Sequence, residues 1–321
     1  MAATATLLPP PGLTTESLPG PWGLRSYRQY LATRFGAQHI RKLCLHAGFS
    51  CPNIDGSRGQ GGCVFCNNAG FVPKGRELPD LRQQWDRGRS ALRRRHRRVD
   101  GFIAYFQAFS NTHGPLDRLR RLLAPLPQDL PECVGVSIST RPDCLDEAVL
   151  EVIADLAQRC FVTLELGLQS DRDRVLRLVR RGHAAACFDD AVQRAAARDI
   201  ELCAHVMLGL PGEGEDAPER LGRHLATLPV RSVKIHNLHI MRHTALERPF
   251  LRGALADLDR HRYAAMVVRL IRHLRPDQYL QRVIADAPDD ILLSAPWCHD
   301  KQDFLAELRD LLQAAPEPIE Q

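Results

Sequence analysis

The feature that most constrains the fold is a regular alternation of short apolar runs with longer runs of helical spacing. The apolar runs are nearly continuous, which is typical of strands buried on both faces. The sequence predicts strands at 42–47, 102–106, 133–139, 162–168, 202–208 and 232–238. It predicts helices at 27–35, 79–98, 116–123, 145–158, 185–198, 218–228 and 257–273. Strands and helices that alternate in this way indicate βα units and a parallel sheet.

Six such strands fit two α/β architectures. A partial (β/α)6 TIM-like barrel and a doubly wound open sheet give the same periodicity, which therefore does not choose between them. In both, we expect polar residues at the carboxyl ends of the strands to carry the chemistry. We expect the core to cover residues 25–278, preceded by a tail at 1–24 whose Pro, Thr and Gly content predicts disorder. A short extension at 279–321 would end in a helix at 304–312.

The composition is that expected of a soluble intracellular enzyme. The chain has 321 residues, of which 44% are hydrophobic and 25% charged, as is ordinary for a globular protein. Its net charge of +5 permits a polyanionic partner without demanding one. No apolar run approaches the roughly 20 residues of a membrane-spanning helix, and the N-terminus lacks the design of a signal peptide. We therefore expect a cytoplasmic protein with no membrane contact.

Three cysteines stand close together in a Gly-rich segment, with no fourth Cys or His close behind them. They are Cys51, Cys63 and Cys66 in the run CPNIDGSRGQGGCVFC. A structural zinc site normally has four protein ligands, and a cubane [4Fe-4S] cluster has four irons to ligate. Three thiolates would leave one iron open to bind a small molecule. The alternative is a zinc knuckle completed by His46, Cys44 or a remote ligand.

The segments around these cysteines and at the strand ends carry a family resemblance. They read LHAGFSCPN at 45–53, GGCVFCN at 61–67, YFQAF at 105–109, TRPDC at 140–144, ELGLQS at 165–170, RGH at 181–183, GLPGE at 209–213, KIHNLH at 234–239 and APWC at 295–298. Together they resemble the bacterial radical S-adenosylmethionine (SAM) proteins usually called YhcC/YtqA, in the group that contains the Elongator catalytic subunit. The resemblance covers roughly residues 27–305 in order. Two departures are Ile54, where the family usually has Arg, and a cysteine spacing wider than the Cys-x-x-x-Cys-x-x-Cys usual in radical SAM enzymes.

The resemblance implies a fold, a reaction and two cofactors. The fold is the partial barrel, and the cofactors are SAM and a [4Fe-4S] cluster held by Cys51, Cys63 and Cys66. The reaction is reductive cleavage of SAM to a 5′-deoxyadenosyl radical that abstracts a substrate hydrogen. An electron donor such as flavodoxin or ferredoxin would supply the electron.

The SAM contacts that we expect are polar residues near the carboxyl ends of the strands. These are Gln107, Ser139, Arg141, Glu165, Gln169 and His205. Arg141 could clamp the SAM carboxylate with its guanidinium fork, and Gln169 resembles a position that contacts the SAM ribose. Ser139 stands where related sequences often have Glu. For each, a packing role is the alternative, above all for His205, since a strand histidine is often a satisfied core group.

Candidates for the later chemistry lie on the sixth strand and in loops. Lys234 and His236 share one face of that strand, while Asn237 and His239 share the other. Two faces cannot both line a barrel interior, and we expect Lys234 and His236 to point inward. Further candidates, each with packing as the alternative, are Tyr105, His113, Cys144, His183 and Cys298.

The substrate is the least constrained part of the prediction. Seven arginines crowd the segment before the second strand: Arg87, Arg89, Arg93, Arg94, Arg95, Arg97 and Arg98. A solvated helix face accounts for such a run, and so does docking of an RNA backbone. Likeness to the Elongator catalytic subunit implies a modified wobble uridine in tRNA. The alternatives are a radical SAM enzyme acting on a small metabolite or peptide, and a non-enzymatic zinc-binding module.

Overall fold

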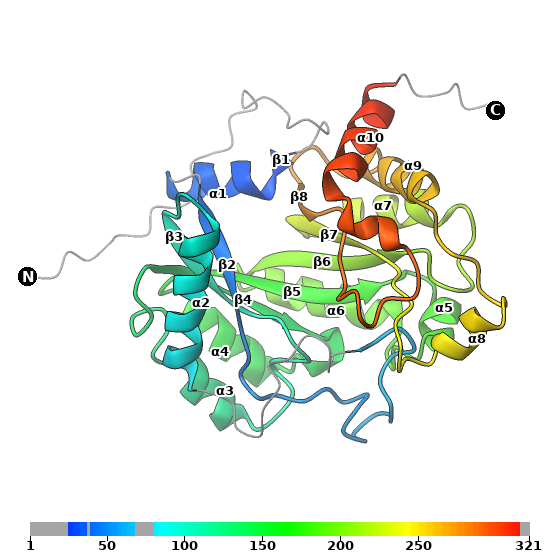
Figure 1. Ribbon diagram of the computed structural model, residues 1–321. Helices are drawn as coiled ribbons and strands as arrows, with labels where there is room; N and C mark the ends of the chain where they lie inside the picture. Colours follow the sequence, from blue (N-terminus) through cyan, green and yellow to red (C-terminus); the bar gives the residue numbers. More distant parts are fainter. Residues whose placement is uncertain (1–24, 37–38, 68–79, 315–321) are drawn as a thin grey trace, which may run out of the picture.

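The computed structural model describes residues 25–36, 39–67 and 80–314. Within these residues, eight parallel strands form one curled sheet in the order β1-β8-β7-β6-β5-β4-β3-β2 (Figure 1). The strands are β1 (Arg25–Ser26), β2 (Ile40–Leu45), β3 (Gly101–Phe106), β4 (Cys133–Thr140), β5 (Phe161–Gln169), β6 (Glu201–Leu208), β7 (Ser232–Asn237) and β8 (Tyr279–Arg282). The six predicted strands are β2 to β7, and the predicted partial barrel is confirmed.

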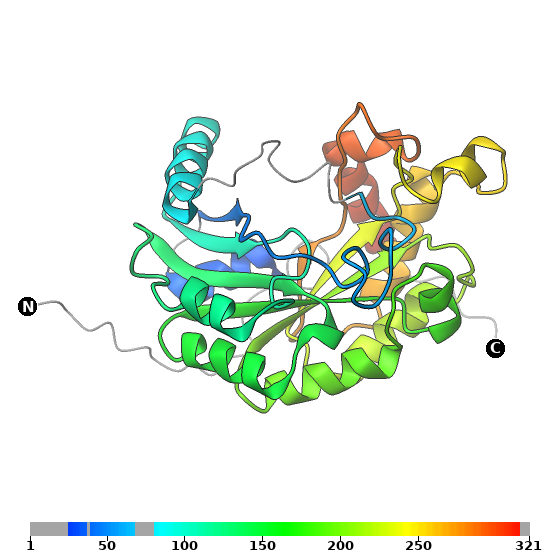
Figure 2. The same cartoon turned by 90° about the horizontal axis from the view of Figure 1, so that it is seen from below.

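The described residues form ten α-helices, most of which connect successive strands. They are α1 (Tyr27–Phe35), α2 (Leu81–Arg95), α3 (Leu116–Leu123), α4 (Glu147–Ala157), α5 (Asp173–Leu178), α6 (Ala185–Ala196), α7 (Ala217–Thr227), α8 (Glu247–Leu251), α9 (Arg260–Ile271) and α10 (Lys301–Gln313), with 3-10 turns at Pro142–Cys144 and Pro296–His299. Figures 1 and 2 show α3, α4 and α6 along the convex side of the sheet. The loop that follows β2, drawn in blue, runs across the other side (Figure 2).

The residue at which a helix begins is set by its N-cap more than by the hydrophobic spacing. The helix predicted from residue 145 begins at Glu147, because the Asp146 carboxylate caps it by accepting a hydrogen bond from the Val149 N–H at 2.8 Å. The helix predicted from residue 257 begins at Arg260 for the same reason, with Asp259 as its cap. Each capping carboxylate satisfies a backbone donor that the helix itself leaves free.

The sheet contains two short edge strands that the sequence analysis did not predict. β8 pairs with β7 on one side and with β1 on the other, so residues 279–282 belong to the same sheet as the core. Its four residues include two polar ones, too few apolar positions to be recognised as a buried strand. The short helices α5 and α8 were also not predicted. The helix expected at 304–312 is present as α10, and the predicted tail at 1–24 lies outside the described residues.

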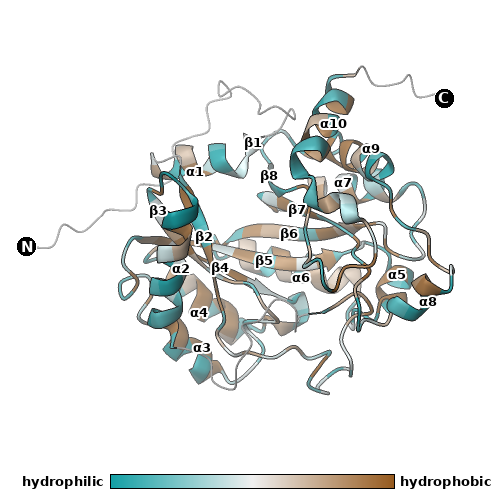
Figure 3. Cartoon of the chain, viewed as in Figure 1, coloured by the Kyte–Doolittle hydropathy of each residue, from teal (hydrophilic) through white to brown (hydrophobic). Residues whose placement is uncertain are grey.

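The hydrophobic core lies between the sheet and its helices. All six residues of β3 are buried, and the central strands are apolar along most of their length (Figure 3). α10 packs on α9 through an aromatic cluster in which the Tyr263 and Phe304 ring centroids lie 5.4 Å apart. None of the helices among the described residues is long and apolar enough to cross a membrane.

Candidate active site

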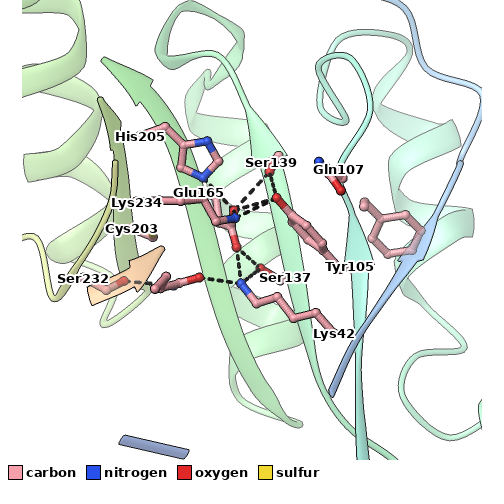
Figure 4. A network of polar contacts seen from close by, with 12 residues as sticks. Lys42, Tyr105, Gln107, Ser137, Ser139, Glu165, Cys203, His205, Ser232 and Lys234 are labelled. Carbon is pink, nitrogen blue, oxygen red and sulfur yellow. Dashed lines mark hydrogen bonds and ion pairs between the residues drawn. The ribbon is translucent and has the colours of Figure 1, made fainter. Parts of the chain in front are cut away.

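The interior of the barrel is lined by a layer of polar side chains, about one from each strand. The layer consists of Lys42 on β2, Tyr105 on β3, Ser137 and Ser139 on β4, Glu165 on β5, His205 on β6, Lys234 on β7 and Gln281 on β8. Figure 4 shows most of these side chains converging on the Glu165 carboxylate. Glu165 is fully buried, and its strand, β5, is a central strand of the sheet.

Both oxygens of the Glu165 carboxylate are saturated with partners. They are Lys42 Nζ and Ser137 Oγ (2.7 Å) at Oε1, and Tyr105 OH (2.9 Å), Lys234 Nζ (2.5 Å) and His205 Nε2 (2.6 Å) at Oε2. Two ammonium groups therefore flank one carboxylate. A buried ionised carboxylate persists only when it is compensated in this way.

The charges of this layer follow from burial and from these contacts. Burial raises the pKa of Glu165, but the Lys234 and Lys42 ammoniums outweigh it and hold the pKa well below its usual value. Burial and the nearby Lys234 charge lower the pKa of His205 to about 4, so its imidazole is neutral at pH 7. Burial and the Glu165 charge raise the pKa of Tyr105 well above its usual value. The layer thus holds an ionised carboxylate, a neutral imidazole and a protonated phenol.

The loop that carries the three cysteines leaves the carboxyl end of β2 and folds over this layer. Its backbone turns back at Gly61 (φ 77°) and Gly62 (φ 78°), a conformation that residues with a Cβ rarely adopt. Cys51 and Cys63 are buried and Cys66 is half-buried. All three line one cavity together with strand-end residues of β3, β4, β5, β6 and β7. Within the described ranges, no three His, Cys, Asp or Glu side chains are grouped as ligands of a single metal ion.

Asn53 fixes the cysteine loop to the segment after α5. Its buried side chain donates hydrogen bonds from Nδ2 to the Arg180 carbonyl (2.8 Å) and the Arg181 carbonyl (3.1 Å). The same amide nitrogen lies 3.4 Å from Cys63 Sγ. Gly182 makes this approach possible, since a Cβ there would lie 2.6 Å from Asn53 Oδ1.

Two guanidinium groups border the cysteines. Arg141, 2% exposed, donates a two-pronged pair of hydrogen bonds to Asp143 (2.8 Å each), while its Nη1 has no partner among the described residues. Arg181 donates from Nη2 to the Gly167 carbonyl (2.8 Å) and from Nη1 towards Cys63 Sγ (3.8 Å). Both guanidiniums line the cavity of the cysteines.

The predicted SAM contacts all line the cavity of the cysteines. Gln107, Ser139, Arg141, Glu165, Gln169 and His205 are among its lining residues. Gln169 holds a left-handed backbone conformation (φ 70°) just where the pairing of β5 with β6 shifts register. That combination turns the end of β5 towards the cavity. Glu165, in contrast, has both oxygens occupied by neighbouring side chains, which fits a supporting role better than a SAM contact.

A second cavity, of about 340 Å³, adjoins the first. Phe65, Cys66, Gln107, His236 and Arg282 line both of them. As expected, Lys234 and His236 point inward: Lys234 donates to Glu165, and the His236 ring lies 5.4 Å from that of His205. Asn237 and His239, which the sequence placed on the other face of β7, line the second cavity as well. They share a 2.8 Å hydrogen bond, and Asn237 Oδ1 accepts another from the Ala285 N–H.

The remaining candidates are spread over the molecule. Cys144 lies in a 3-10 turn and Cys298 in the hydrophobic core, and neither lines the cavity of the cysteines. His113 contacts the Asp55 carboxylate at 2.8 Å beside the cysteine loop. His183 lines a separate outer cavity, where burial lowers its pKa to about 4. Tyr105 is the only one of the five in the polar layer.

The fold brings together several residues that the sequence motifs did not single out. Lys42, Ser137 and Gln281 complete the polar layer, Asn53 and Arg181 contact Cys63 Sγ, and Arg282 lies between the two cavities. Lys42 gave a usable signal, because a lysine inside an apolar strand needs a buried partner. Arg282 gave none, since β8 itself was not predicted.

Comparison with known proteins supplies the family. The family description "Radical SAM superfamily" matches residues 55–225, and "Radical_SAM C-terminal domain" matches residues 230–314. The chain belongs to the radical SAM superfamily. It is 33% identical to Protein YhcC of Escherichia coli K12 over 279 residues, which are 87% of this chain and 88% of that protein. It is also 33% identical to the uncharacterized protein YtqA of Bacillus subtilis over 286 residues, 88% of each chain.

More distant similarity reaches proteins named for tRNA or for Elongator. This radical SAM enzyme is 26% identical to a tRNA uridine(34) acetyltransferase of Methanocaldococcus infernus over 166 residues, 50% of this chain and 30% of that protein. The solved structure of the Elp3 protein of the same archaeon, with its N-terminus deleted, superposes with a TM-score of 0.60 at 15% identity. The superposition covers 84% of this chain and 63% of the other, and it shows a shared fold.

Proposed function

We propose that Cys51, Cys63 and Cys66 hold a [4Fe-4S] cluster and that SAM binds beside it in the cavity that they line. The observation that carries the proposal is the meeting of all three cysteines with the strand-end residues in one cavity, in a chain of this superfamily. A cubane takes each thiolate on a different iron, so its cysteines need not converge on one point as zinc ligands do. The three cysteines line one cavity without forming a single-ion ligand group among the described residues, which is consistent with a cluster.

The surroundings of the cysteines also fit an anionic cluster. Asn53 and Arg181 aim donors at Cys63 Sγ, and the unpartnered Arg141 Nη1 borders the same cavity. Donors and positive charge near the sulfurs stabilise thiolate-bound iron. Ile54 removes the further cation that the family usually carries in this loop, yet these two arginines remain.

The protein's part in the reaction is to bind, orient and exclude water. The chemistry that the cluster and SAM supply when bound is one-electron reductive cleavage of SAM to a 5′-deoxyadenosyl radical. Arg141 Nη1 would bind the carboxylate of SAM, and Gln169 its ribose. Glu165 would hold Lys234, Tyr105 and His205 in fixed positions through its hydrogen bonds. Flavodoxin or ferredoxin would donate the electron.

For the substrate we propose tRNA, with a wobble uridine as its target. Support comes from the similarity to the tRNA uridine(34) acetyltransferase and from the cavity beside the cysteines, which has the size of a small-ligand site. Deleting the gene should change the mass of one modified nucleoside in digested total tRNA. An unchanged nucleoside profile would contradict tRNA and point to a small metabolite or peptide.

The cluster has a separate test. Anaerobically reconstituted protein should contain about four irons and four sulfides per chain and should release 5′-deoxyadenosine from SAM with dithionite. Cys51→Ala, Cys63→Ala and Cys66→Ala should each lose the iron. Cys44→Ala and Cys187→Ala, which serve as matched controls for iron content, should keep it. Iron that survives Cys51→Ala but not Cys44→Ala would overturn the ligand assignment.

A further inference from the structure

β8 carries a register shift that turns two successive side chains into the barrel. The pairing with β7 shifts between Val233 and Lys234, so that Lys234 lies opposite Arg282 and Gln281 is the extra residue. In a regular strand Gln281 and Arg282 would point to opposite faces. Here Gln281 accepts a hydrogen bond from the lysine of β2 at 2.6 Å, while Arg282 lines both interior cavities. Bulges that re-aim a side chain in this way are common beside active sites.

Arg282 brings a positive charge without a directly bonded partner to the second cavity. Its guanidinium makes no side-chain hydrogen bond and no ion pair within 4 Å with any other residue that the structure describes, and its charge acts on Asp286 only at longer range. The cavity's one carboxylate, Asp286, is held by the Lys301 ammonium at 2.6 Å. Burial lowers the pKa of His236 well below its usual value and that of His239 to about 4, so neither imidazole adds charge at pH 7. An arginine left without a partner in a cavity is suited to an anionic ligand.

The rest of the second cavity suits a flat, uncharged ring. Phe65 from the cysteine loop lines it, together with the thioethers of Met207 and Met241. The His236 Nε2 atom is buried without a hydrogen-bond partner among the described residues. Aromatic and thioether side chains bind planar rings by stacking and dispersion, and a neutral imidazole adds one directional hydrogen bond. A cavity of about 340 Å³ is large enough for a small ligand.

We propose that this cavity binds a nucleotide, with its phosphate on Arg282 and its base between Phe65 and His236. An uncharged ring alone would leave the Arg282 guanidinium without a hydrogen-bond acceptor, and an anion alone would leave the apolar wall uncovered. A nucleotide satisfies both, because it joins a planar uncharged base to a phosphate at a fixed distance. The inference rests on the proposed function, and it deepens that function by naming the group that the substrate must present.

Equilibrium binding to the reconstituted protein with SAM present tests this assignment. The probes are uridine 5′-monophosphate, uridine and an anticodon stem-loop RNA, each measured by calorimetry. Wild-type protein should bind uridine 5′-monophosphate more tightly than uridine. Arg282→Gln should weaken the monophosphate by about tenfold or more and leave uridine nearly unchanged, since it removes a charge-assisted contact to phosphate only. Phe65→Leu should weaken both probes alike, because it removes the stacking surface.

The controls separate this inference from the proposed function. Arg97→Gln, a change at an exposed arginine of the segment after α2, should alter neither free probe. Arg282→Gln should also weaken the stem-loop RNA if the nucleotide enters as part of an RNA. Equal binding of the monophosphate by wild type and Arg282→Gln, or equal losses of both free probes in Arg282→Gln, overturns the assignment. Iron and sulfide content, determined on the same samples, reports on the cluster independently of either result.

Discussion

Glu165 is the residue on which the charge balance of the barrel interior depends. Its carboxylate is the partner of two ammonium groups, those of the half-buried Lys42 and the buried Lys234, whose strands lie on either side of β5 in the sheet. Burial lowers the pKa of Lys42, and the Lys234 charge lowers it further, so the carboxylate is what keeps the two cations compatible. Breaking a buried ion pair by removing one partner costs far more than the pair contributes when intact.

Replacing Glu165 with Gln should therefore destabilise the protein strongly. We expect Glu165→Gln to lower the free energy of unfolding by about 3–5 kcal/mol, the usual cost of an uncompensated buried charge, in urea denaturation at pH 7. Glu147→Gln is the matched control, because Glu147 is 61% exposed and its contacts to Arg194 and Arg198 lie at the surface. It should change stability by about 1 kcal/mol or less. A loss in Glu165→Gln no larger than in the control would contradict the role of Glu165.

His205 makes the stability dependent on pH with a definite sign. Its pKa of about 4 lies below the value of 6.5 expected in the unfolded chain. Between these two values the unfolded chain binds a proton that the folded chain excludes, so stability falls as the pH falls through that window. For one such histidine the loss between pH 7 and pH 5 is about 1–2 kcal/mol. Urea unfolding at both pH values should show His205→Gln losing less stability than wild type, by about that amount.

An exposed histidine provides the comparison. His261 is 74% exposed and contacts Glu307 at the surface. His261→Gln should keep the wild-type difference in stability between pH 7 and pH 5 to within about 0.5 kcal/mol. If His205→Gln and wild type lost the same amount on acidification, His205 would not be the neutral, buried group described here.

At the scale of single elements, the cysteine loop is held by Asn53 rather than by its own hydrophobic packing. The Asn53 amide satisfies the carbonyls of Arg180 and Arg181 and at the same time approaches Cys63 Sγ. Hydrogen bonds to cluster sulfurs raise the reduction potential, because they stabilise the more negative, reduced state. The segment after α5 therefore both anchors the loop and tunes the proposed cluster.

Asn53→Ala should lower the reduction potential of the bound cluster. The change removes a donor 3.4 Å from Cys63 Sγ, and potentiometric titration followed by electron paramagnetic resonance measures the midpoint directly. It also leaves two carbonyls unsatisfied, at a cost in stability of about 1–3 kcal/mol. Asn53→Asp and Asn53→Ser separate the two effects: the first places a negative charge beside the cluster and should lower the potential further, while the second keeps a small donor. If all three variants had the midpoint potential of the wild-type protein, Asn53 would not tune the cluster.

Helices and strands with a clear hydrophobic pattern could be predicted from the sequence. A strand whose place is set by its pairing with a neighbouring strand could not. The six apolar strands and the helix at 27–35 were predicted because burial on both faces and regular spacing appear directly in the residue order. β8 was missed because its place is set by pairing with β7, and its inward Arg282 by a bulge that no spacing rule shows. Cys144 and Cys298 became candidates as cysteines in family motifs, yet both lie away from the cavity of the cysteines.

At the scale of the whole molecule, the arginine-rich segment lies far from the opening of the barrel. α2 runs antiparallel to the strands: Gln84 near its start lines the second cavity, and its last residues lead to the beginning of β3. At about 1.5 Å per residue, Arg95 lies about 17 Å further along the helix axis than Gln84. Arg89 and Arg93 are also paired with Glu132, and Arg98 with Asp100. This run therefore fits a solvated outer surface better than it fits delivery of a base to the cavity.

Other arginines surround the opening itself. α5, α8 and the cysteine loop pack together through a small apolar cluster that includes Val64, Val175, Val179 and Leu246. Exposed arginines stand on these rim segments, none of them in an ion pair with another described residue: Arg177, Arg180, Arg242, Arg248 and Arg252. An RNA that presents a base to the cavity would bring its phosphates against this rim.

Substitutions at the rim and in the arginine-rich segment should therefore have different effects on tRNA binding. Changing Arg177, Arg180 and Arg242 together to Gln should weaken tRNA binding and flatten the dependence of log K on log salt by about 2–3 units, somewhat under one for each phosphate that is no longer neutralised. Changing Arg94, Arg95 and Arg97 to Gln removes the same charge from the far end of α2 and should leave the slope nearly unchanged. Filter binding of tRNA over a series of salt concentrations measures both. If the second triple flattened the slope and the first did not, the RNA would follow the outer helix and could not reach the cavity in the orientation proposed here.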